Sequence, residues 1–155
     1  MNRKILLVDI DHTLAASHWR DIYKPNDEEK AGDWDEYHAY SKDDKTIDEI
    51  VDVIRALSST GWYPIGITAR PGKWRDQTID WLIQNDIFIV EVLMRGDDDF
   101  RNSVDIKKDL FLERFPDRTD HTFLLLDDHP GVIAAFATMN VTSLQVVASH
   151  SYHGR

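Results

Sequence analysis

Hydrophobic runs alternate with segments of helical spacing along most of the chain. Five runs rich in Val, Ile, Leu and aromatic residues predict strands at residues 4–9, 62–68, 87–94, 122–127 and 143–147. The segments between them carry apolar positions three and four residues apart, as in the stripe over residues 47–57. Strands that alternate with helices are typical of a parallel sheet covered on both faces. The pattern therefore predicts an α/β fold with a doubly wound, Rossmann-like sheet of five parallel strands.

Local signals mark where the predicted helices begin and end. Thr46 and Glu49 have the spacing of a capping box, and Gly61 stands where the first helix should stop. The other helices are predicted at residues 73–85, 103–115 and 130–139. Each helix thus falls between two predicted strands, as the alternation requires.

Residues 15–45 interrupt this alternation, because the segment is polar and aromatic without clean periodicity. A loop this long in a compact domain is usually functional or holds small structure of its own. We interpret it as an insertion, or flap, over the active site of a single domain that spans residues 1–155. Its aromatic residues, Tyr37 among them, either stack on a nucleobase or form a small core, and the sequence leaves both open.

Composition narrows the classes of partner. The formal net charge of −10 argues against an extended face that binds a nucleic-acid duplex, although it allows a local grip on one phosphate. The absence of cysteine favours a reducing, cytoplasmic location, and no apolar run is long enough to span a membrane. The oligomeric state leaves no sign in the sequence.

Acidic residues gather where two of the predicted strands end. Asp9 and Asp11 close the first strand, and Asp127 and Asp128 close the fourth. Two such charges about 4 Å apart repel by roughly 4 kcal/mol at an effective dielectric constant near 20, so a cation should lie between them. In open α/β sheets, ligands bind at the carboxyl ends of the strands. Because the available donors are carboxylate oxygens, the sequence predicts a Mg²⁺ site at this edge.

Four short motifs carry a resemblance to a known family. They are DIDHT at residues 9–13, ITAR at 67–70, DIKKDLF at 105–111 and LLLDDHP at 124–130. In this order they resemble the motifs of the haloacid dehalogenase-like phosphatases. Within that superfamily, the chain is most similar to the 3′-phosphatase half of phage polynucleotide kinases. The resemblance implies Mg²⁺-dependent hydrolysis of phosphate monoesters.

The resemblance also assigns roles to the acidic residues. Asp9 is expected to attack phosphorus and form an aspartyl-phosphate, one of the recognised covalent intermediates. Asp11 is expected to protonate the leaving oxygen and then to take a proton from water. The metal ligands implied are Asp9, Asp127, Asp128 and the backbone carbonyl of Asp11.

Other matched positions are expected to hold the phosphoryl group. Thr68 would bond a phosphoryl oxygen, and Lys107 rather than its neighbour Lys108 would offset the charge of the transition state. Thr13 is expected to hold the loop after the nucleophile and to lie at the substrate. His12 stands where the family most often has glycine, which makes the backbone turn less permissive. Its side chain either takes part in protonation or is a plain loop residue.

Four arginines are candidate substrate contacts. Arg20 and Arg70 match arginines of the polynucleotide-phosphatase branch, while Arg95 and Arg101 flank an acidic loop. The alternative for each is a surface ion pair with a nearby acid.

The sequence thus predicts a phosphatase whose partner is a phosphorylated nucleic-acid end. A free nucleotide or another small phosphate ester is the alternative substrate. A phosphoryl-accepting receiver domain is a remote alternative, because the middle strands end in Thr68 and Arg95 rather than in a carboxylate. The sequence leaves DNA and RNA ends both open.

Overall fold

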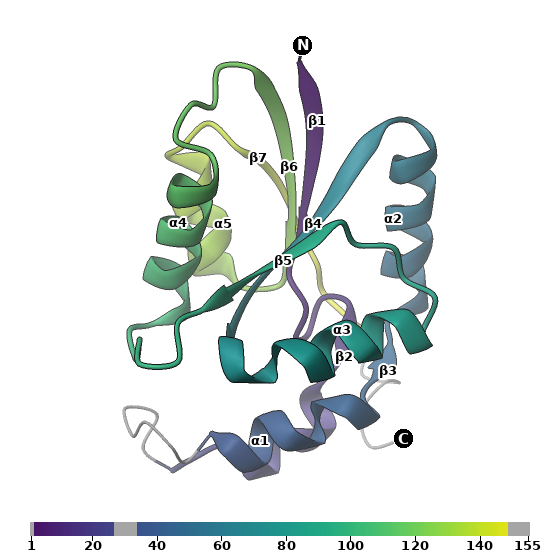
Figure 1. Cartoon of the computed structure of the whole chain (residues 1–155), viewed down its shortest axis with the longest axis vertical. Coiled ribbons are helices and arrows are strands. Elements are labelled where there is room, and N and C mark those ends of the chain that lie inside the picture. The colour runs from purple at the N-terminus through teal and green to yellow at the C-terminus, as the bar shows by residue number, and fades with distance from the viewer. Residues whose placement is uncertain (1, 27–33, 149–155) are drawn as a thin grey trace.

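Five parallel strands form the central sheet within residues 2–26 and 34–148, which the computed structural model describes (Figure 1). Their spatial order is β5 (Glu91–Arg95), β4 (Trp62–Pro71), β1 (Arg3–Val8), β6 (His121–Asp127) and β7 (Thr142–Gln145). The chain runs outward from β1 to β5, then returns to the other side of β1 with β6. This order confirms the predicted doubly wound sheet. It also places the topological switch point between β1 and β6.

Two pairs of helices cover the two faces of the sheet (Figure 1). One face carries α2 (Asp48–Ser59) and α3 (Arg75–Gln84), and the other carries α4 (Ser103–Arg114) and α5 (Pro130–Ala137). Among the described residues, no helix has the length and apolar character needed to cross a membrane.

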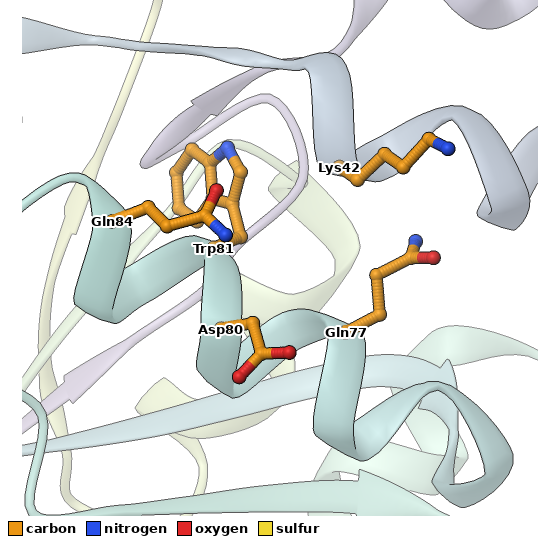
Figure 2. A pocket seen from close by; sticks show the side chains of 5 residues that line it. All are labelled: Lys42, Gln77, Asp80, Trp81 and Gln84. Carbon is orange, nitrogen blue, oxygen red and sulfur yellow. The ribbon is translucent and has the colours of Figure 1, made fainter.

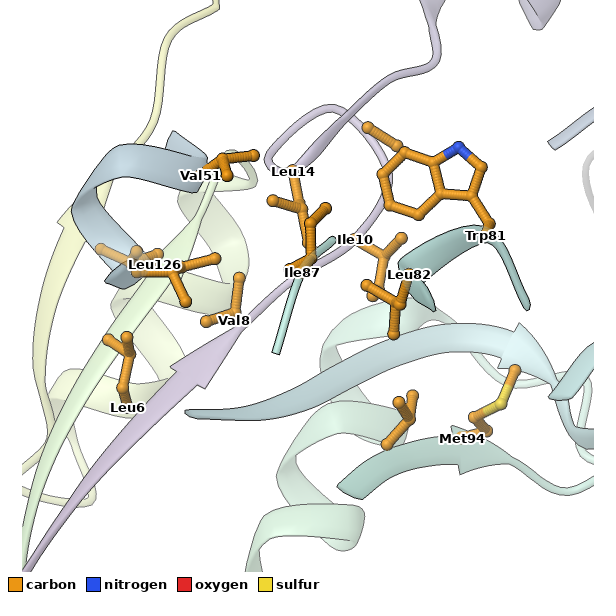
Figure 3. Close-up of a cluster of buried hydrophobic side chains, with 13 residues drawn as sticks. Leu6, Val8, Ile10, Leu14, Val51, Trp81, Leu82, Ile87, Met94 and Leu126 are labelled. Carbon is orange, nitrogen blue, oxygen red and sulfur yellow. The ribbon is translucent and has the colours of Figure 1, made fainter. Parts of the chain in front are cut away.

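Each face of the sheet has its own hydrophobic core. Leu6 and Val8 of β1 belong to the cluster beneath α2 and α3, which Figure 3 shows together with Trp81. Ile5 and Leu7 point to the opposite face, among residues of α4 and α5. Side chains of a strand alternate between faces, so an unbroken apolar run is what a strand buried on both sides requires.

The starts of β5 and α2 differ from the sequence prediction. The strand predicted at residues 87–94 begins only at Glu91, because the backbone of Ile87 bonds back to Leu82 at the end of α3. The N-cap of α2 is Ile47, without a side-chain cap, so the predicted capping box is wrong. Thr46 instead lies in a short strand, and its hydroxyl donates to the Asp48 carboxylate at 2.6 Å.

The insertion after β1 has small structure of its own. Its described elements are β2 (Ala15–Ala16), the 3₁₀ helix η1 (His18–Tyr23), α1 (Asp35–Ala39), the 3₁₀ helix η2 (Tyr40–Asp43) and β3 (Lys45–Thr46). The strands β2 and β3 form an antiparallel pair. Residues 27–33 of the predicted insertion lie outside the described residues. Figure 1 places α1 beside α3, where Gln77 donates to the carbonyl of His38 at 2.9 Å.

Candidate active site

The ends of β1 and β6 bring two of the predicted acids together. Val8 pairs with Leu126, and the Asp9 amide donates to the Leu126 carbonyl at 3.0 Å. Asp9 and Asp127 are therefore neighbours at the switch point. Lys107 connects them, because its Nζ lies 2.8 Å from Asp9 Oδ1 and 2.6 Å from Asp127 Oδ2. All three side chains are buried.

Asp128 completes a cluster of three carboxylates. Asp9, Asp127 and Asp128 each offer an oxygen within 4.8 Å of the others. Burial and the charge of Asp9 raise the pKa of Asp127 to about 6 and that of Asp128 to about 8. Three carboxylates around one ammonium are short of positive charge, and hard oxygen donors are the ligands that Mg²⁺ prefers. The residues present therefore fit the magnesium site expected from the sequence.

The two oxygens of the Asp9 carboxylate have different partners. Oδ1 accepts from Lys107, whereas Oδ2 accepts from the hydroxyl of Thr13 at 2.9 Å. The same hydroxyl lies 3.5 Å from Asp128 Oδ1. Because a hydroxyl carries only one proton, Thr13 can donate to only one of these acids at a time. Thr13 thus joins the nucleophile candidate to the third carboxylate.

The register of α4 determines which lysine enters the cluster. Ile106 and Phe111 bury one face of the helix against the sheet, and Lys107 is buried beside that face. Lys108 is only half-buried. Burial opposes the charged form of Lys107, but Asp9 and Asp127 together raise its pKa above the ordinary value. The position predicted for Lys107 is the one observed.

A tight turn after β1 aims the next acid in another direction. The amides of Leu14 and Ala15 both donate to the carbonyl of Ile10, which folds the chain back on itself. His12 has a φ of 63°, in the left-handed region where glycine is favoured. Its ring is half-buried and stacks on His18 at 4.0 Å, and burial lowers its pKa to about 4. His12 is therefore a neutral side chain at neutral pH.

Asp11 lies between two arginines rather than sharing a cation with Asp9. Arg70 donates to its carboxylate from Nε at 3.0 Å and from Nη2 at 2.7 Å, and Arg20 donates from Nη2. Burial raises the pKa of Asp11, but Arg70 and Arg20 outweigh it and hold that pKa well below the usual range. Each of the two acids thus has cationic partners of its own, Lys107 for Asp9 and the two arginines for Asp11.

Asp44 was not among the predicted site residues, and the structure places it beside Arg20. Both are buried, and Arg20 donates from Nε and Nη2 to the two oxygens of Asp44. The guanidinium also stacks on the Tyr37 ring at 4.1 Å. Tyr37 itself is buried, which agrees with the small-core alternative for this residue. Nothing in the local sequence distinguishes Asp44 from the exposed acid that precedes it.

The other predicted contact residues are Thr68, Arg95 and Arg101. Thr68 is buried near the end of β4, and its hydroxyl accepts from the amide of Arg70 at 3.2 Å. Arg101 is exposed and pairs with Asp99 and Asp109, which agrees with the surface ion pair weighed for it. Arg95 donates to the carbonyl of Asp99 at 3.1 Å. Substrate contacts by Arg95 and Arg101 stay predictions.

A comparison with known protein families identifies the family of this chain. A model of the polynucleotide kinase PNKP phosphatase domain matches residues 3–150. The chain belongs to this family. It is therefore a PNKP-type phosphatase domain of the haloacid dehalogenase-like class, as the motifs indicated. A search of curated proteins found no match.

Solved structures with the same fold include much longer chains. A chain in the structure of the Pnkp1/Rnl/Hen1 complex is 25% identical, with a TM-score of 0.76, and the match covers 94% of this chain and 46% of that one. A chain of the Pnkp1/Rnl/Hen1 RNA repair complex is 24% identical, with a TM-score of 0.78, and 94% and 42% are covered. The PNKP-type domain thus spans less than half of either chain. The putative HAD-hydrolase YfnB from Bacillus subtilis, bound to magnesium, is 14% identical with a TM-score of 0.62, and 94% and 87% are covered.

Proposed function

We propose that the protein is a Mg²⁺-dependent phosphomonoesterase that removes 3′-phosphates from nucleic-acid ends. The observation that carries this proposal is the cluster of buried Asp9 and Asp127 and half-buried Asp128 with Lys107 at the switch point. Membership of the PNKP phosphatase family supports a nucleic-acid end as substrate. A structural relative in an RNA repair complex supports the inclusion of RNA ends among the substrates to be tested.

Asp9 is the nucleophile in this proposal. One of its carboxylate oxygens attacks phosphorus, the bond from phosphorus to the ester oxygen breaks, and an aspartyl-phosphate forms. Water then attacks the same phosphorus, and the bond to Asp9 breaks to release inorganic phosphate. The contacts of Asp9 with Lys107 and Thr13 hold the carboxylate in one orientation for both attacks.

Asp11 is the proton donor and acceptor. It gives its proton to the leaving ester oxygen and later takes one from the attacking water. Arg20 and Arg70 keep this carboxyl ionised in the structure. A phosphate dianion that binds the same guanidinium groups offsets the two positive charges that depress the Asp11 pKa, so substrate binding raises that pKa. Asp11 then takes up the proton that catalysis requires.

The remaining residues bind the phosphoryl group. Thr68 donates a hydrogen bond to a phosphoryl oxygen, and Arg20 and Arg70 pair with the others. Lys107 offsets negative charge that accumulates in the transition state. Mg²⁺, held by the three carboxylates and the Asp11 carbonyl, supplies further charge neutralisation when bound.

A phosphate-release panel tests the proposal with the full chain. The substrates are oligonucleotides with a 3′-phosphate or a 5′-phosphate, as DNA and as RNA, and free nucleotides, each with Mg²⁺ or with EDTA. We expect the highest kcat/KM with a 3′-phosphate and no release in EDTA. A preference for free nucleotides of more than tenfold, about 1.4 kcal/mol, would overturn the end-processing part of the proposal.

Asp9→Asn tests the chemistry separately. The variant keeps a hydrogen-bonding side chain of the same shape, so we expect a folded protein without phosphate release. Asp52→Asn on the exposed side of α2 is the matched control and should keep full activity. Normal turnover by Asp9→Asn would exclude Asp9 as the nucleophile.

A further inference from the structure

Each nitrogen of the Arg20 guanidinium has a protein partner. Its Nε lies 3.0 Å from Asp44 Oδ1, its Nη2 lies 2.8 Å from Asp44 Oδ2, and its Nη1 donates to the carbonyl of Tyr37 at 3.0 Å. Of its nitrogens, only Nη2 also reaches Asp11. The orientation of Arg20 toward the active site is therefore set by Asp44 and the Tyr37 carbonyl.

Asp44 is itself held from several directions. Its carboxylate also accepts from the indole of Trp19 at 2.8 Å and from the hydroxyl of Ser17 at 3.0 Å. Its backbone carbonyl accepts from the indole of Trp81 at 2.8 Å. Because both its main chain and its side chain are bonded, Asp44 has little freedom to follow a moving arginine.

Trp81 belongs to α3, and this helix anchors the whole end of the insertion. Figure 2 shows Trp81 and Gln77 on α3 lining a pocket that Lys42 of the insertion also lines. Gln77 donates to the hydroxyl of Ser41 at 2.9 Å. The main chain of Asp44 is thus bonded to α3, whose Trp81 belongs to the hydrophobic core, and its carboxylate is bonded within the insertion.

We propose that Asp44 is a positioning residue that holds Arg20 with its Nη2 directed at Asp11 and the reacting phosphoryl group. The effect of Asp44 on catalysis rests on the proposed function. Its effect on the position of Arg20 rests only on the observed contacts. A buried carboxylate is costly to keep unless it is paired, and anchoring the insertion requires only a neutral acceptor. The charge of Asp44 therefore serves Arg20.

The placement of Arg20 can be measured without any activity. In the ¹⁵N-labelled full chain, we expect a resolved Nε–H signal of Arg20 that exchanges slowly with water, assigned by its loss in Arg20→Lys. Asp44→Asn should speed this exchange at least tenfold. Asp43→Asn is the matched control on the exposed neighbouring position and should change it less than twofold. If Asp44→Asn does not fold, fast exchange in the wild type would by itself overturn the proposal.

A double-mutant cycle measures the consequence for catalysis. We expect Asp44→Asn to lower kcat/KM on a 3′-phosphorylated oligonucleotide at least tenfold in the wild-type background, and less than threefold in Arg20→Lys. Equal losses in the two backgrounds would mean that Asp44 acts only on the stability of the insertion, and would overturn the proposal. An inactive wild type would overturn the proposed function, and the Nε–H exchange would still decide whether Asp44 holds Arg20.

Discussion

Lys107→Met removes the ammonium between two buried carboxylates and keeps a side chain of similar length. Nζ lies 2.8 Å from Asp9 and 2.6 Å from Asp127, and all three side chains are buried. Removing one partner of a buried ion pair leaves an uncompensated charge and costs about 3–5 kcal/mol. We expect the variant to lose this much free energy of unfolding at pH 8 in EDTA. Phosphate release should fall by at least about 100-fold, because transition-state charge is no longer offset.

The stability loss should shrink as the pH falls. The pKa of Lys107 is raised above its ordinary value, so the wild type carries this charge at pH 5 and at pH 8 alike. In the variant, the pKa of Asp127, already about 6, rises further without its cation. The folded variant then binds a proton that the unfolded chain does not bind. Its stability relative to the wild type therefore decreases between pH 5 and pH 8.

Urea unfolding at these two pH values, in EDTA, measures both effects. Lys108→Met is the matched control, since it changes the adjacent, half-buried lysine of the same helix. We expect the control to lose less than about 1 kcal/mol at either pH. Equal losses for the two variants at pH 8, or a loss for Lys107→Met that does not depend on pH, would refute this account of the site.

Three further predictions concern the metal, the arginines and the turn. Mg²⁺ affinity should rise by up to about tenfold per pH unit between pH 6 and 8, because Asp128, with a pKa of about 8, must lose its proton before it binds metal. Calorimetry in buffers of different ionisation enthalpy measures the released proton, and a binding heat that does not depend on the buffer would contradict the prediction. In steady-state kinetics, Arg101→Ala should change kcat/KM less than about twofold, because it breaks only exposed ion pairs. Arg70→Lys should lower kcat/KM at least about tenfold, because lysine cannot replace the two-nitrogen contact with Asp11. His12→Gly should change the free energy of unfolding by less than about 1 kcal/mol in chemical denaturation. Relief of the left-handed backbone offsets the lost ring contacts. A larger loss would contradict this prediction, because it would mean that the ring contacts stabilise the turn more than the backbone strains it.

The fold could be predicted from the sequence because burial on both faces leaves a direct mark on each strand. The unbroken apolar run before Asp9 indicates a central parallel strand, and β1 is in the middle of the sheet. The same apolar signal predicted a strand start at residue 87 that is wrong, because β5 begins at Glu91. Ile87 is buried and Ile89 packs against the core, but this segment precedes the strand. Apolar pattern reports contact with a core, and it does not report whether the backbone pairs with a neighbouring strand.

Two of the predicted acids meet because each lies where a strand ends. Asp9 and Asp127 each follow a paired residue of adjacent strands, so the sheet register alone brings them together. Asp44 had no such signal. Its partner Arg20 is 24 positions away, and the two meet only because the insertion folds back on α3. Asp43 and Asp44 look alike in sequence, yet one is exposed and the other buried.

The described residues around the turn after β1 form two charge clusters of different balance. The first has three carboxylates, on Asp9, Asp127 and Asp128, around one ammonium, so it is short of positive charge. The second has two carboxylates, on Asp11 and Asp44, against the two guanidinium groups of Arg20 and Arg70, so it is balanced.

The net charges of these two clusters suit the two charged ligands of a phosphatase, a metal cation and a phosphate group. A divalent cation relieves the deficit of the first cluster. In the proposed function, a phosphate dianion that engages the arginines of the second cluster leaves negative charge in excess, and uptake of a proton by Asp11 lowers that excess by one charge. Because Asp44 accepts from two nitrogens of Arg20, our proposal is that the arginine stays in place during this exchange. In the proposed function, the short turn from Asp9 to Asp11 thus joins a cluster that would bind a metal to a carboxyl that would become protonated when substrate binds.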